Sequence, residues 1–221
     1  MAGMDYMKLP NLVGLQNFTR DLNYAGLTSE GWDDPFNLLP PSLLLFCLAT
    51  VGRPRGPLAF WVLLNTVLIH PMDFFVGALG RGPKYLSDEY AVMDTRYWPL
   101  DDPTVAWISY LELAVYVPLG YFWYKGVVEG KWFQHFHALL VSTFQLMGCI
   151  LYLGCEWHCN FSHLPSPDWP WPRFDSYLKI KYFWLIFVGC NGVWIVVPLL
   201  VYWHTFSEMS KLPTTAKSKK H

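Results

Sequence analysis

The stretch 103–124, PTVAWISYLELAVYVPLGYFWY, decides the fold. A helix needs about 20 largely apolar residues to cross the hydrocarbon core of a bilayer. This stretch is long enough, and its one charged residue, Glu112, lies near its middle. Pro118 is tolerated in such a helix, because neighbouring groups can satisfy the backbone carbonyl that a proline frees. The stretch therefore predicts a membrane-spanning helix with an acid buried inside it.

Three further stretches are apolar enough to span a bilayer: residues 57–79, 134–155 and 181–204. A fifth, residues 38–51, is shorter, and we interpret it as a first span that is tilted or extended by polar residues. The pattern predicts an all-α integral membrane protein, a bundle of about five transmembrane helices with an internal pocket. Between the second and third spans, residues 80–102 are expected to form a polar loop.

The composition supports a membrane protein and offers nothing to nucleic acid. Of the 221 residues, 53% are hydrophobic and 15% are charged, whereas soluble domains carry about 25% charged residues. Such a chain needs the lipid bilayer to cover its apolar surface. Its net charge of −1 provides no general basic character for binding a phosphate backbone.

The chain is expected to divide into three parts. Residues 1–35 form a polar segment on the membrane surface or in the lumen, residues 36–205 the transmembrane domain, and residues 206–221 a basic tail. With five spans, the basic residues of the short connections share one side with the tail: Arg53, Arg55, Lys125 and Lys131. Because short basic connections stay in the cytosol, we expect a multi-pass protein with a cytosolic C-terminus.

Two weaker signals suggest the endoplasmic reticulum membrane. The tail ends in KSKKH, with lysines third and fifth from the end, which is similar to the dilysine signal for return to that compartment. Two glycosylation sequons, at Asn17 and Asn160, fall on the predicted lumenal side.

Polar side chains recur on one face of each of four spans. Residues three or four apart in a helix share a face, and an ionisable side chain in a span costs about 3 kcal/mol or more unless it is paired or faces a cavity. The sets are Ser109, Glu112 and Tyr116; Thr66, His70 and Asp73; Gln145, Tyr152 and Glu156; and Asn191 with Trp194. We expect these faces to line the internal pocket, although any single face could serve only to join helices.

The residue types in this pocket suit proton chemistry. A carboxyl group away from water favours its neutral form, so Glu112 is the expected proton donor, with His70 and Asp73 as a proton-relay pair. Aromatic rings stabilise cations, which assigns Trp194 and Tyr116 to face a carbocation. Asn191 would orient a polar group, and the other substrate-binding candidates are Ser109, Gln145, Tyr152 and Glu156.

A metal site is not expected. Cys155, His158, Cys159 and His163 are close in sequence, but their spacing does not match a paired Cys-x-x-Cys framework. Protonation and deprotonation leave the electron count unchanged, so no redox cofactor is needed either.

Several motifs resemble the emopamil-binding protein family, whose shared module is the EXPERA domain and whose members include the sterol Δ8–Δ7 isomerase and the sigma-2 receptor. They are EYAVMDTRY at 89–97, QLMG at 145–148 followed by Tyr152 and Glu156, NGVW at 191–194 with Pro198, and Ile69-His70. The resemblance covers about residues 57–205 and the tail. It implies that Glu89, Asp94 and Arg96 have a structural role, with Asp94 and Arg96 forming an ion pair that closes the pocket.

The chain departs from the isomerase pattern at two carboxylates. The isomerase has a Glu four residues after its His, where this chain has Phe74 and the nearest acid is Asp73. Counted back from Pro118, Ser109 stands at the position of a second isomerase Glu, and Glu112 lies about one helical turn away. These differences imply a related fold with a different substrate.

The sequence therefore predicts an enzyme that protonates a sterol or terpenoid and either shifts a double bond or closes a ring from an olefin or epoxide. A specialised terpenoid substrate is favoured. The alternatives are the sterol Δ8–Δ7 isomerase itself, a non-enzymatic sterol or amphiphilic-amine binding protein like the sigma-2 receptor, and a structural or trafficking protein. A homodimer is compatible with the sequence.

Overall fold

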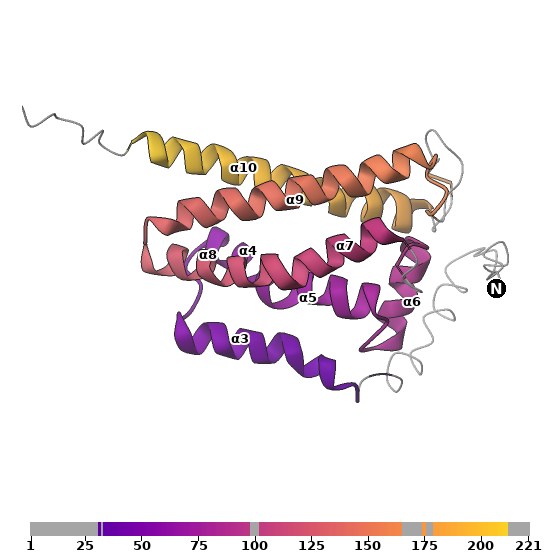
Figure 1. The fold of residues 1–221 in the computed structure, drawn as a ribbon, viewed down its shortest axis with the longest axis horizontal. Coiled ribbons are helices and arrows are strands. Elements are labelled where there is room, and N and C mark those ends of the chain that lie inside the picture. The colour runs from indigo at the N-terminus through magenta and orange to yellow at the C-terminus, as the bar shows by residue number, and fades with distance from the viewer. Residues whose placement is uncertain (1–30, 32, 98–101, 165–173, 176–178, 212–221) are drawn as a thin grey trace, which may run out of the picture.

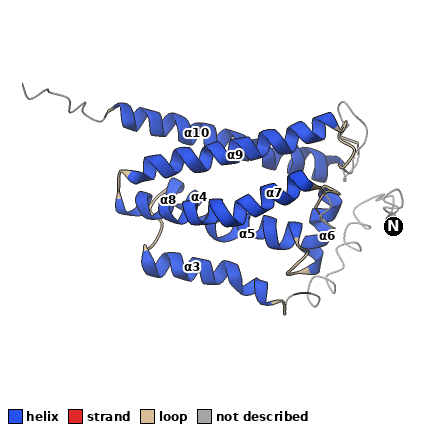
Figure 2. Cartoon of the chain, in the orientation of Figure 1, coloured by secondary structure: helices blue, strands red, loops and turns tan. Residues whose placement is uncertain are grey.

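The computed structural model describes residues 31, 33–97, 102–164, 174–175 and 179–211. Every regular element in these ranges is helical, and no strand occurs in them (Figure 2). Most of the N-terminal segment 1–35 and the end of the tail, including its terminal lysines, lie outside the described residues, as does the sequon at Asn17.

The first pass is a short helix, α3 (Leu39–Thr50), which follows a single 3-10 turn, η2 (Pro35–Leu38). The second pass is continuous from Pro57 to Ala78. It consists of α4 (Pro57–Leu64), η3 (Asn65–Ile69), α5 (His70–Met72) and η4 (Asp73–Ala78).

The remaining passes are longer. The third consists of α7 (Pro103–Leu111), η5 (Glu112–Tyr116) and α8 (Val117–Glu129). The fourth is α9 (Phe133–His158), and the fifth is η6 (Lys179–Cys190) continued by α10 (Asn191–Ser210). Four of the passes are long and apolar enough to cross a membrane, and α3 with its preceding turn is an apolar helix below that length. The four long spans predicted from the sequence are confirmed, and the first stretch is short, as expected.

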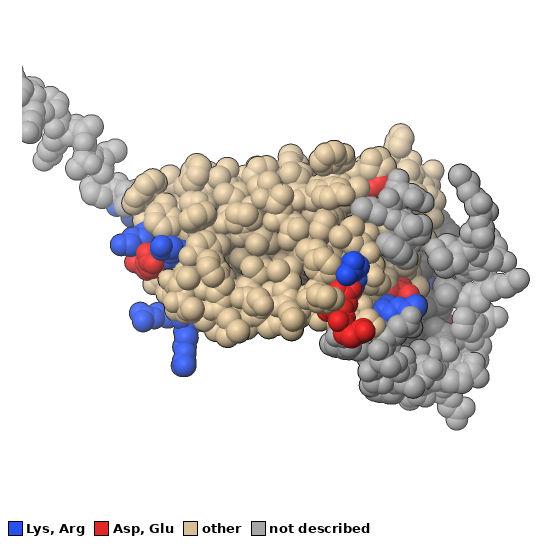
Figure 3. Space-filling model, turned by 60° about the horizontal axis from the view of Figure 1, so that its bottom comes forward, with Lys and Arg blue, Asp and Glu red and all other residues tan. Residues whose placement is uncertain are grey.

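The passes run alternately up and down one bundle, so that the start of α3 and the end of α10 lie at opposite ends (Figure 1). On the face shown in Figure 3, Lys, Arg, Asp and Glu gather toward the two ends and leave an uncharged band between them. Large apolar side chains such as Leu200 and Trp203 point outward from α10 and are 60% and 78% exposed. This surface suits contact with lipid acyl chains.

The prediction of a loop between the second and third spans is wrong for ten residues. These residues form helix α6 (Lys84–Met93), which lies across one end of the bundle (Figure 1). The reason is a helical pattern: Leu86, Tyr90 and Met93 are spaced for one face, and the charged Lys84 and Asp88 lie on the opposite face. A helix of this kind lies flat over the ends of the spans. Glu89 therefore belongs to a helix and not to a loop.

Four segments have π-helical hydrogen bonding: η3, η4, η5 and η6. Two of them end two residues before a proline, η3 before Pro71 and η5 before Pro118. Proline has no N–H and leaves a carbonyl of the preceding turn without its usual donor. Wider i→i+5 pairing lets the helix absorb that defect, and π segments of this kind are frequent at functional sites.

Gly120 brings the second and third passes together beside the polar residues. A Cβ at Gly120 would overlap with the hydroxyl of Thr66, which donates to Val62 O in its own helix at 2.7 Å. Thr66 is therefore packed against α8 and does not face the internal cavity described below. This close approach holds η3, and with it His70, against the third pass.

We expect Gly120→Ala to lower the Tm of the purified protein, because overpacking a close contact costs about 1–3 kcal/mol. Adding Thr66→Ala should recover most of the loss, since it removes the atom that the new methyl group meets. Gly154→Ala is the matched control, because a Cβ there meets nothing within 4 Å. Equal Tm values for the Gly120 and Gly154 variants would contradict the packing described here.

Candidate functional site

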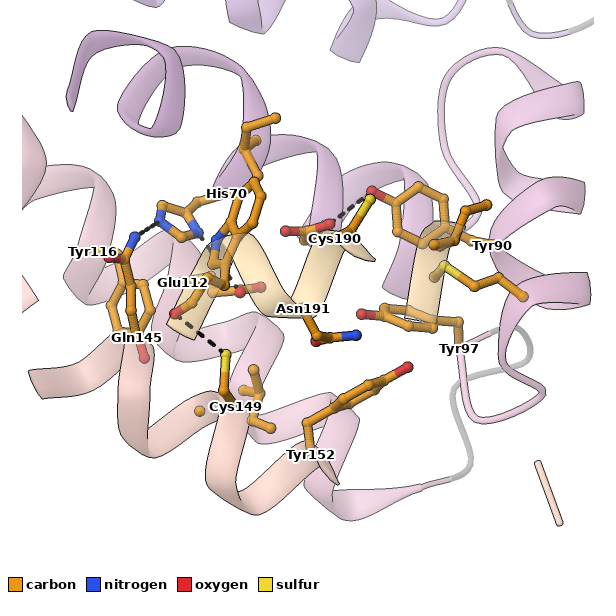
Figure 4. A pocket seen from close by; sticks show the side chains of 17 residues that line it. His70, Tyr90, Tyr97, Glu112, Tyr116, Gln145, Cys149, Tyr152, Cys190 and Asn191 are labelled. Carbon is orange, nitrogen blue, oxygen red and sulfur yellow. Dashed lines mark hydrogen bonds and ion pairs between the residues drawn. The ribbon is translucent and has the colours of Figure 1, made fainter. Parts of the chain in front are cut away.

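A cavity of about 270 Å³ lies inside the bundle, between the second, third, fourth and fifth passes and beneath α6 (Figure 4). Its lining consists of aromatic, aliphatic and polar side chains: Ile69, His70, Asp73, Tyr90, Met93, Tyr97, Ile108, Glu112, Tyr116, Gln145, Gly148, Cys149, Tyr152, Ile186, Cys190, Asn191 and Trp194. None of these lining residues is Lys or Arg. The cavity is therefore an aromatic and apolar chamber that contains two carboxyl groups.

Most residues predicted from the sequence meet in this chamber. The three catalytic candidates, Glu112, His70 and Asp73, all line it. Five of the seven substrate-binding candidates do so as well: Asn191, Trp194, Tyr116, Gln145 and Tyr152. Ser109 and Glu156 are buried but are not part of the lining, so the geometry gives a ligand no direct contact with either.

His70 and the two carboxyl groups form a compact group. His70 Nδ1 lies 3.6 Å from Glu112 Oε1, and the ligand-capable atoms of all three residues lie within 4.8 Å of one another. Asp73 accepts a 2.6 Å hydrogen bond from the hydroxyl of Tyr90. Glu112 therefore faces the imidazole, and Asp73, predicted to form a relay pair with His70, is held by Tyr90.

The π segments place these groups. Asp73 is the first residue of η4, Glu112 is the first residue of η5, and Asn191 follows the last residue of η6. A π turn adds a residue to the ring closed by the backbone hydrogen bond and so rotates the side chains that follow it. Asp73, at the start of η4, faces the cavity, whereas Phe74, the next residue, packs against Phe75 and Tyr110.

Tyr90 and Tyr97 extend the site beyond the spans. Their rings meet edge to face with centroids 5.2 Å apart. Gly77 in η4 leaves room for them, since a Cβ there would lie 2.7 Å from the Tyr90 ring. Burial and the nearby Asp73 raise the pKa of Tyr90 well above its usual range. The Tyr90 hydroxyl therefore stays protonated and serves as a hydrogen-bond donor to Asp73.

Aromatic rings form the inner walls. Tyr116 stands edge to face against His70 with centroids 5.0 Å apart, and its hydroxyl donates to Phe144 O at 2.8 Å. The ring of Trp194 packs against the ring of Trp61, with centroids 5.3 Å apart. Asn191 donates one amide N–H to Phe187 O at 2.6 Å, which leaves its carbonyl oxygen and its second N–H to contact a ligand.

A buried ion cluster lies beside the chamber and contacts its wall at Tyr152. Arg96 makes paired hydrogen bonds to Asp94, the shortest 2.6 Å, and its Nε lies 3.1 Å from Glu156 Oε1. Tyr152 donates to Asp94 Oδ2 at 2.6 Å, and His163 Nδ1 lies 2.7 Å from Glu156 Oε1. The expected Asp94–Arg96 pair is present, and Tyr152 connects it to the cavity wall.

The charge of Arg96 is secured by this cluster. Burial opposes the charge, but the hydrogen bonds and charge of Asp94 outweigh burial and raise the pKa of Arg96 above its usual range. Glu156, predicted to bind substrate, is instead committed to Arg96 and His163. Glu89 also has a structural contact, since it accepts from Lys181 at 2.5 Å and from Tyr182 at 3.1 Å and so ties α6 to η6.

Several lining residues were not predicted as site residues: Tyr90, Met93, Tyr97, Cys149, Cys190, Ile69, Ile108, Gly148 and Ile186. Tyr90, Met93 and Tyr97 belong to the quoted motif 89–97, so a signal for them existed. Once that motif is understood as a helix and a turn over the bundle, its apolar residues point down into the chamber. The two cysteines carried no signal that separates them from ordinary buried residues.

The group of His70, Asp73 and Glu112 has a spacing that could hold a divalent cation, with one imidazole and two carboxylate ligands. The surrounding donors do not favour one. Tyr90 already directs its proton to Asp73, and the amide nitrogen of Gln145 lies 3.4 Å from His70 Nε2. The arrangement therefore suits proton transfer better than metal binding.

Comparison with known proteins gives one family and several distant relatives. The family described as EXPERA (EXPanded EBP superfamily) matches residues 84–205, more than half of the chain. A probable 3-beta-hydroxysteroid-Delta(8),Delta(7)-isomerase of Oryza sativa subsp. japonica is 24% identical over 143 residues. The isomeliandiol synthase of Ailanthus altissima is 23% identical over 211 residues, and the 3-beta-hydroxysteroid-Delta(8),Delta(7)-isomerase of Mus musculus is 26% identical over 152 residues.

These alignments differ in extent. The chain spans 58% of the rice relative and 60% of the mouse relative, in alignments that cover 63% and 66% of the chain itself. The alignment with the isomeliandiol synthase covers 90% of the chain and 94% of that relative. All three alignments are longer than the matched domain, and the alignment with the isomeliandiol synthase covers most of the chain.

The ion cluster gives a stability prediction. Arg96→Gln should destabilise the protein by about 3–5 kcal/mol, because it leaves Asp94 and Glu156 as buried, uncompensated charges. Thermal unfolding of the purified protein measures the effect.

Arg81→Gln is the matched control. Arg81 also pairs with an aspartate, Asp34, at 2.7 Å, but the Arg81 side chain is 47% exposed. The hydrogen bond from Arg81 holds the pKa of Asp34 below its usual range, yet solvent screens such exposed pairs, and the Tm should barely change. A larger loss for the Arg81 variant would be inconsistent with Arg96 as the main anchor.

Proposed function

The chain belongs to the EXPERA family, the expanded EBP superfamily, and on that premise we propose that it is a membrane enzyme that rearranges an isoprenoid through a carbocation. Glu112 protonates an olefin or an epoxide of the substrate. The cation then loses a proton from a neighbouring carbon, which shifts the double bond. Alternatively an internal olefin attacks the cation, which closes a ring and leaves a new cation, and this cation loses a proton from a neighbouring carbon. One proton enters and one leaves, so the product is an isomer of the substrate.

The observation that carries this proposal is the pair of carboxyl groups, Glu112 and Asp73, beside one imidazole inside an otherwise apolar chamber. General acid–base catalysis needs a group that gives a proton and another that takes one, both within reach of the same substrate. Glu112 is the donor, and Asp73, held by Tyr90, takes the proton back. Positioned groups of this kind contribute rate factors of about 10²–10⁴.

The walls support a cationic intermediate. Aromatic faces attract positive charge, and the rings of Trp194 and Tyr116 border the same chamber as Glu112. Apolar walls also limit the water that could trap the cation. Asn191 offers its carbonyl oxygen to a hydroxyl group of the substrate, which would fix the distance between that hydroxyl and the reacting carbon.

A terpenoid is the preferred substrate class within this proposal. The relatives whose names identify them as sterol isomerases align over about three fifths of their lengths, whereas the isomeliandiol synthase aligns over 94% of its length. Phe74 and Ser109 also replace the two carboxylates of the isomerase pattern, and Asp73 and Glu112 line the chamber in their place. A displaced acid would protonate a different atom.

We further propose that the protein resides in the endoplasmic reticulum membrane with its C-terminus in the cytosol. Arg53 and Arg55 lie between α3 and α4, and Lys125 and Lys131 lie where the third pass meets the fourth. Because the passes alternate, these connections and the end of α10 share one end of the bundle (Figure 1). An excess of basic residues in short connections marks the cytosolic side.

A second candidate function is binding without turnover. Two carboxyl groups face a chamber whose described lining has no Lys or Arg, so the amine of an amphiphilic ligand could pair with them, or a sterol hydroxyl could donate to them. The chemistry of the site is the same in both cases. The two functions differ only in whether the ligand leaves unchanged.

The conversion test uses membranes from cells expressing the chain, incubated in deuterated water with a Δ8-sterol and, separately, with a farnesyl-chain epoxide. We expect a product isomeric with its substrate, carrying one deuterium, to be detected by mass spectrometry. Glu112→Gln should lower its formation at least about 10²-fold, because the amide cannot supply the proton. Treatment with a metal chelator should leave turnover unchanged.

Glu129→Gln is the matched control. It makes the same change at the end of the same pass, in an exposed residue paired with Lys125 at 4.0 Å, and should keep full activity. Full activity of Glu112→Gln would remove Glu112 from the mechanism, and loss of activity with chelator would favour a metal ion at His70. Saturable sterol binding with no product from either substrate would favour the binding function.

A further inference from the structure

A chain of buried polar side chains leads from a backbone carbonyl to the side of His70 that faces away from Glu112. Asn65 Nδ2 donates to Trp61 O at 2.8 Å. Gln145 Nε2 lies 3.4 Å from Asn65 Oδ1 and also 3.4 Å from His70 Nε2. Asn65, Gln145 and His70 are all buried, with 5%, 3% and 1% of their surfaces exposed.

The backbone carbonyl of Trp61 determines which atoms donate and which accept along this series of side chains. A backbone carbonyl can only accept a hydrogen bond, so Asn65 must turn its amide nitrogen toward Trp61 and its oxygen toward Gln145. That oxygen in turn requires a donor, so Gln145 must present its NH₂ group. Flipping either amide would set oxygen against oxygen or N–H against N–H in a buried site, which is costly.

The amide nitrogen of Gln145 therefore also faces His70 Nε2 with a proton, as Figure 4 shows for the pair. Nε2 can accept that proton only if it carries none itself. The single proton of the neutral imidazole then resides on Nδ1, which lies 3.6 Å from Glu112 Oε1.

We propose that Asn65, acting through Gln145, fixes His70 in the Nδ1–H tautomer, so that His70 directs its N–H at Glu112 across 3.6 Å. Asn65 and Gln145 are positioning residues. Gln145, expected from the sequence to contact substrate, has one amide group directed at Asn65 and His70. Asn65 was not among the predicted site residues.

The consequence for catalysis rests on the proposed function. Protonated Glu112 accepts from His70 through one oxygen and presents its O–H to the substrate from the other. When the O–H bond breaks and the proton joins the substrate carbon or oxygen, the electron pair stays on Glu112 as a carboxylate. The Nδ1–H of His70 then stabilises that new charge without giving up its proton, as a preorganised donor does.

The tautomer can be measured without any substrate, so its outcome is independent of the conversion assay. The full chain, labelled with ¹⁵N in its histidine rings and placed in lipid nanodiscs, is examined by NMR. The chain has seven histidines, and the His70 signals are identified by their absence in His70→Asn. Couplings to the ring C–H protons tell Nδ1 from Nε2, and the ¹⁵N shift tells which nitrogen carries the proton.

We expect the proton of wild-type His70 on Nδ1, and a mixture of both tautomers in Asn65→Leu. Thr66→Val is the matched control and should match the wild type. Thr66 also donates to the carbonyl four residues back, at 2.7 Å, but it packs against α8 and not against Gln145. Gln145→Leu provides a second route to the mixture if Asn65→Leu does not fold.

A proton on Nε2 of wild-type His70 would overturn the proposal, and this result needs no variant. A single Nδ1–H tautomer that persists in the Asn65 or the Gln145 variant would overturn it too, because the chain of amides would then not determine the tautomer.

Discussion

The rest of this structure depends on the cost of placing a carboxyl group in hydrocarbon. Glu112 and Asp73 sit within spans, where an ionisable group without a partner costs about 3 kcal/mol or more. The bundle meets that constraint by directing both carboxyls inward and placing a polar partner beside each. His70 Nδ1 lies 3.6 Å from Glu112, and Tyr90 donates a hydrogen bond to Asp73. The internal chamber, the donors around it and the helix α6 that supplies Tyr90 all follow from that requirement.

The π turns are the local means by which the helices meet it. In a straight α-helix, Asp73 and Phe74 follow His70 by three and four residues, so both side chains would lie near its face. With η4 beginning at Asp73, the carboxyl lines the chamber and Phe74 packs between Phe75 and Tyr110 instead. Prolines just beyond η3 and η5 disrupt the regular pairing at the same places. The sequence features that weaken the helices therefore coincide with those that position the site.

This explains which features could be predicted from the sequence and which could not. The four long spans and the inward direction of Glu112, His70, Gln145 and Asn191 follow from length, hydropathy and helical spacing, and the structure agrees. Helical spacing failed where the π turns change the register, so Thr66 was expected beside His70 but packs on Gly120.

Tertiary partners account for the remaining misses. Glu156 lies one helical turn after Tyr152 and shares its face, yet it is bound by Arg96 and His163, which come from segments distant in the sequence or beyond the span end. Asn65 gains its importance only from Gln145, which is 80 positions away. No periodicity within one helix reports such a partner.

The two carboxyl groups depart from the isomerase pattern in a related way. On the third pass the acid stands three residues later, at Glu112 where the pattern has position 109, a displacement of about 4.5 Å along the helix axis. On the second pass it stands one residue earlier, at Asp73 where the pattern has position 74. These two passes run in opposite directions (Figure 1). Both displacements therefore point the same way, away from α6 and toward the end of the bundle where α3 meets α4. If the carboxylates at positions 74 and 109 had been lost independently, we would not expect two other carboxylates, Asp73 and Glu112, to lie together. On the proposed function, the joint displacement would keep an acid and a base around His70 and would move the reaction centre deeper into the bundle. That position would suit a substrate whose reacting carbon lies farther from the end that α6 covers.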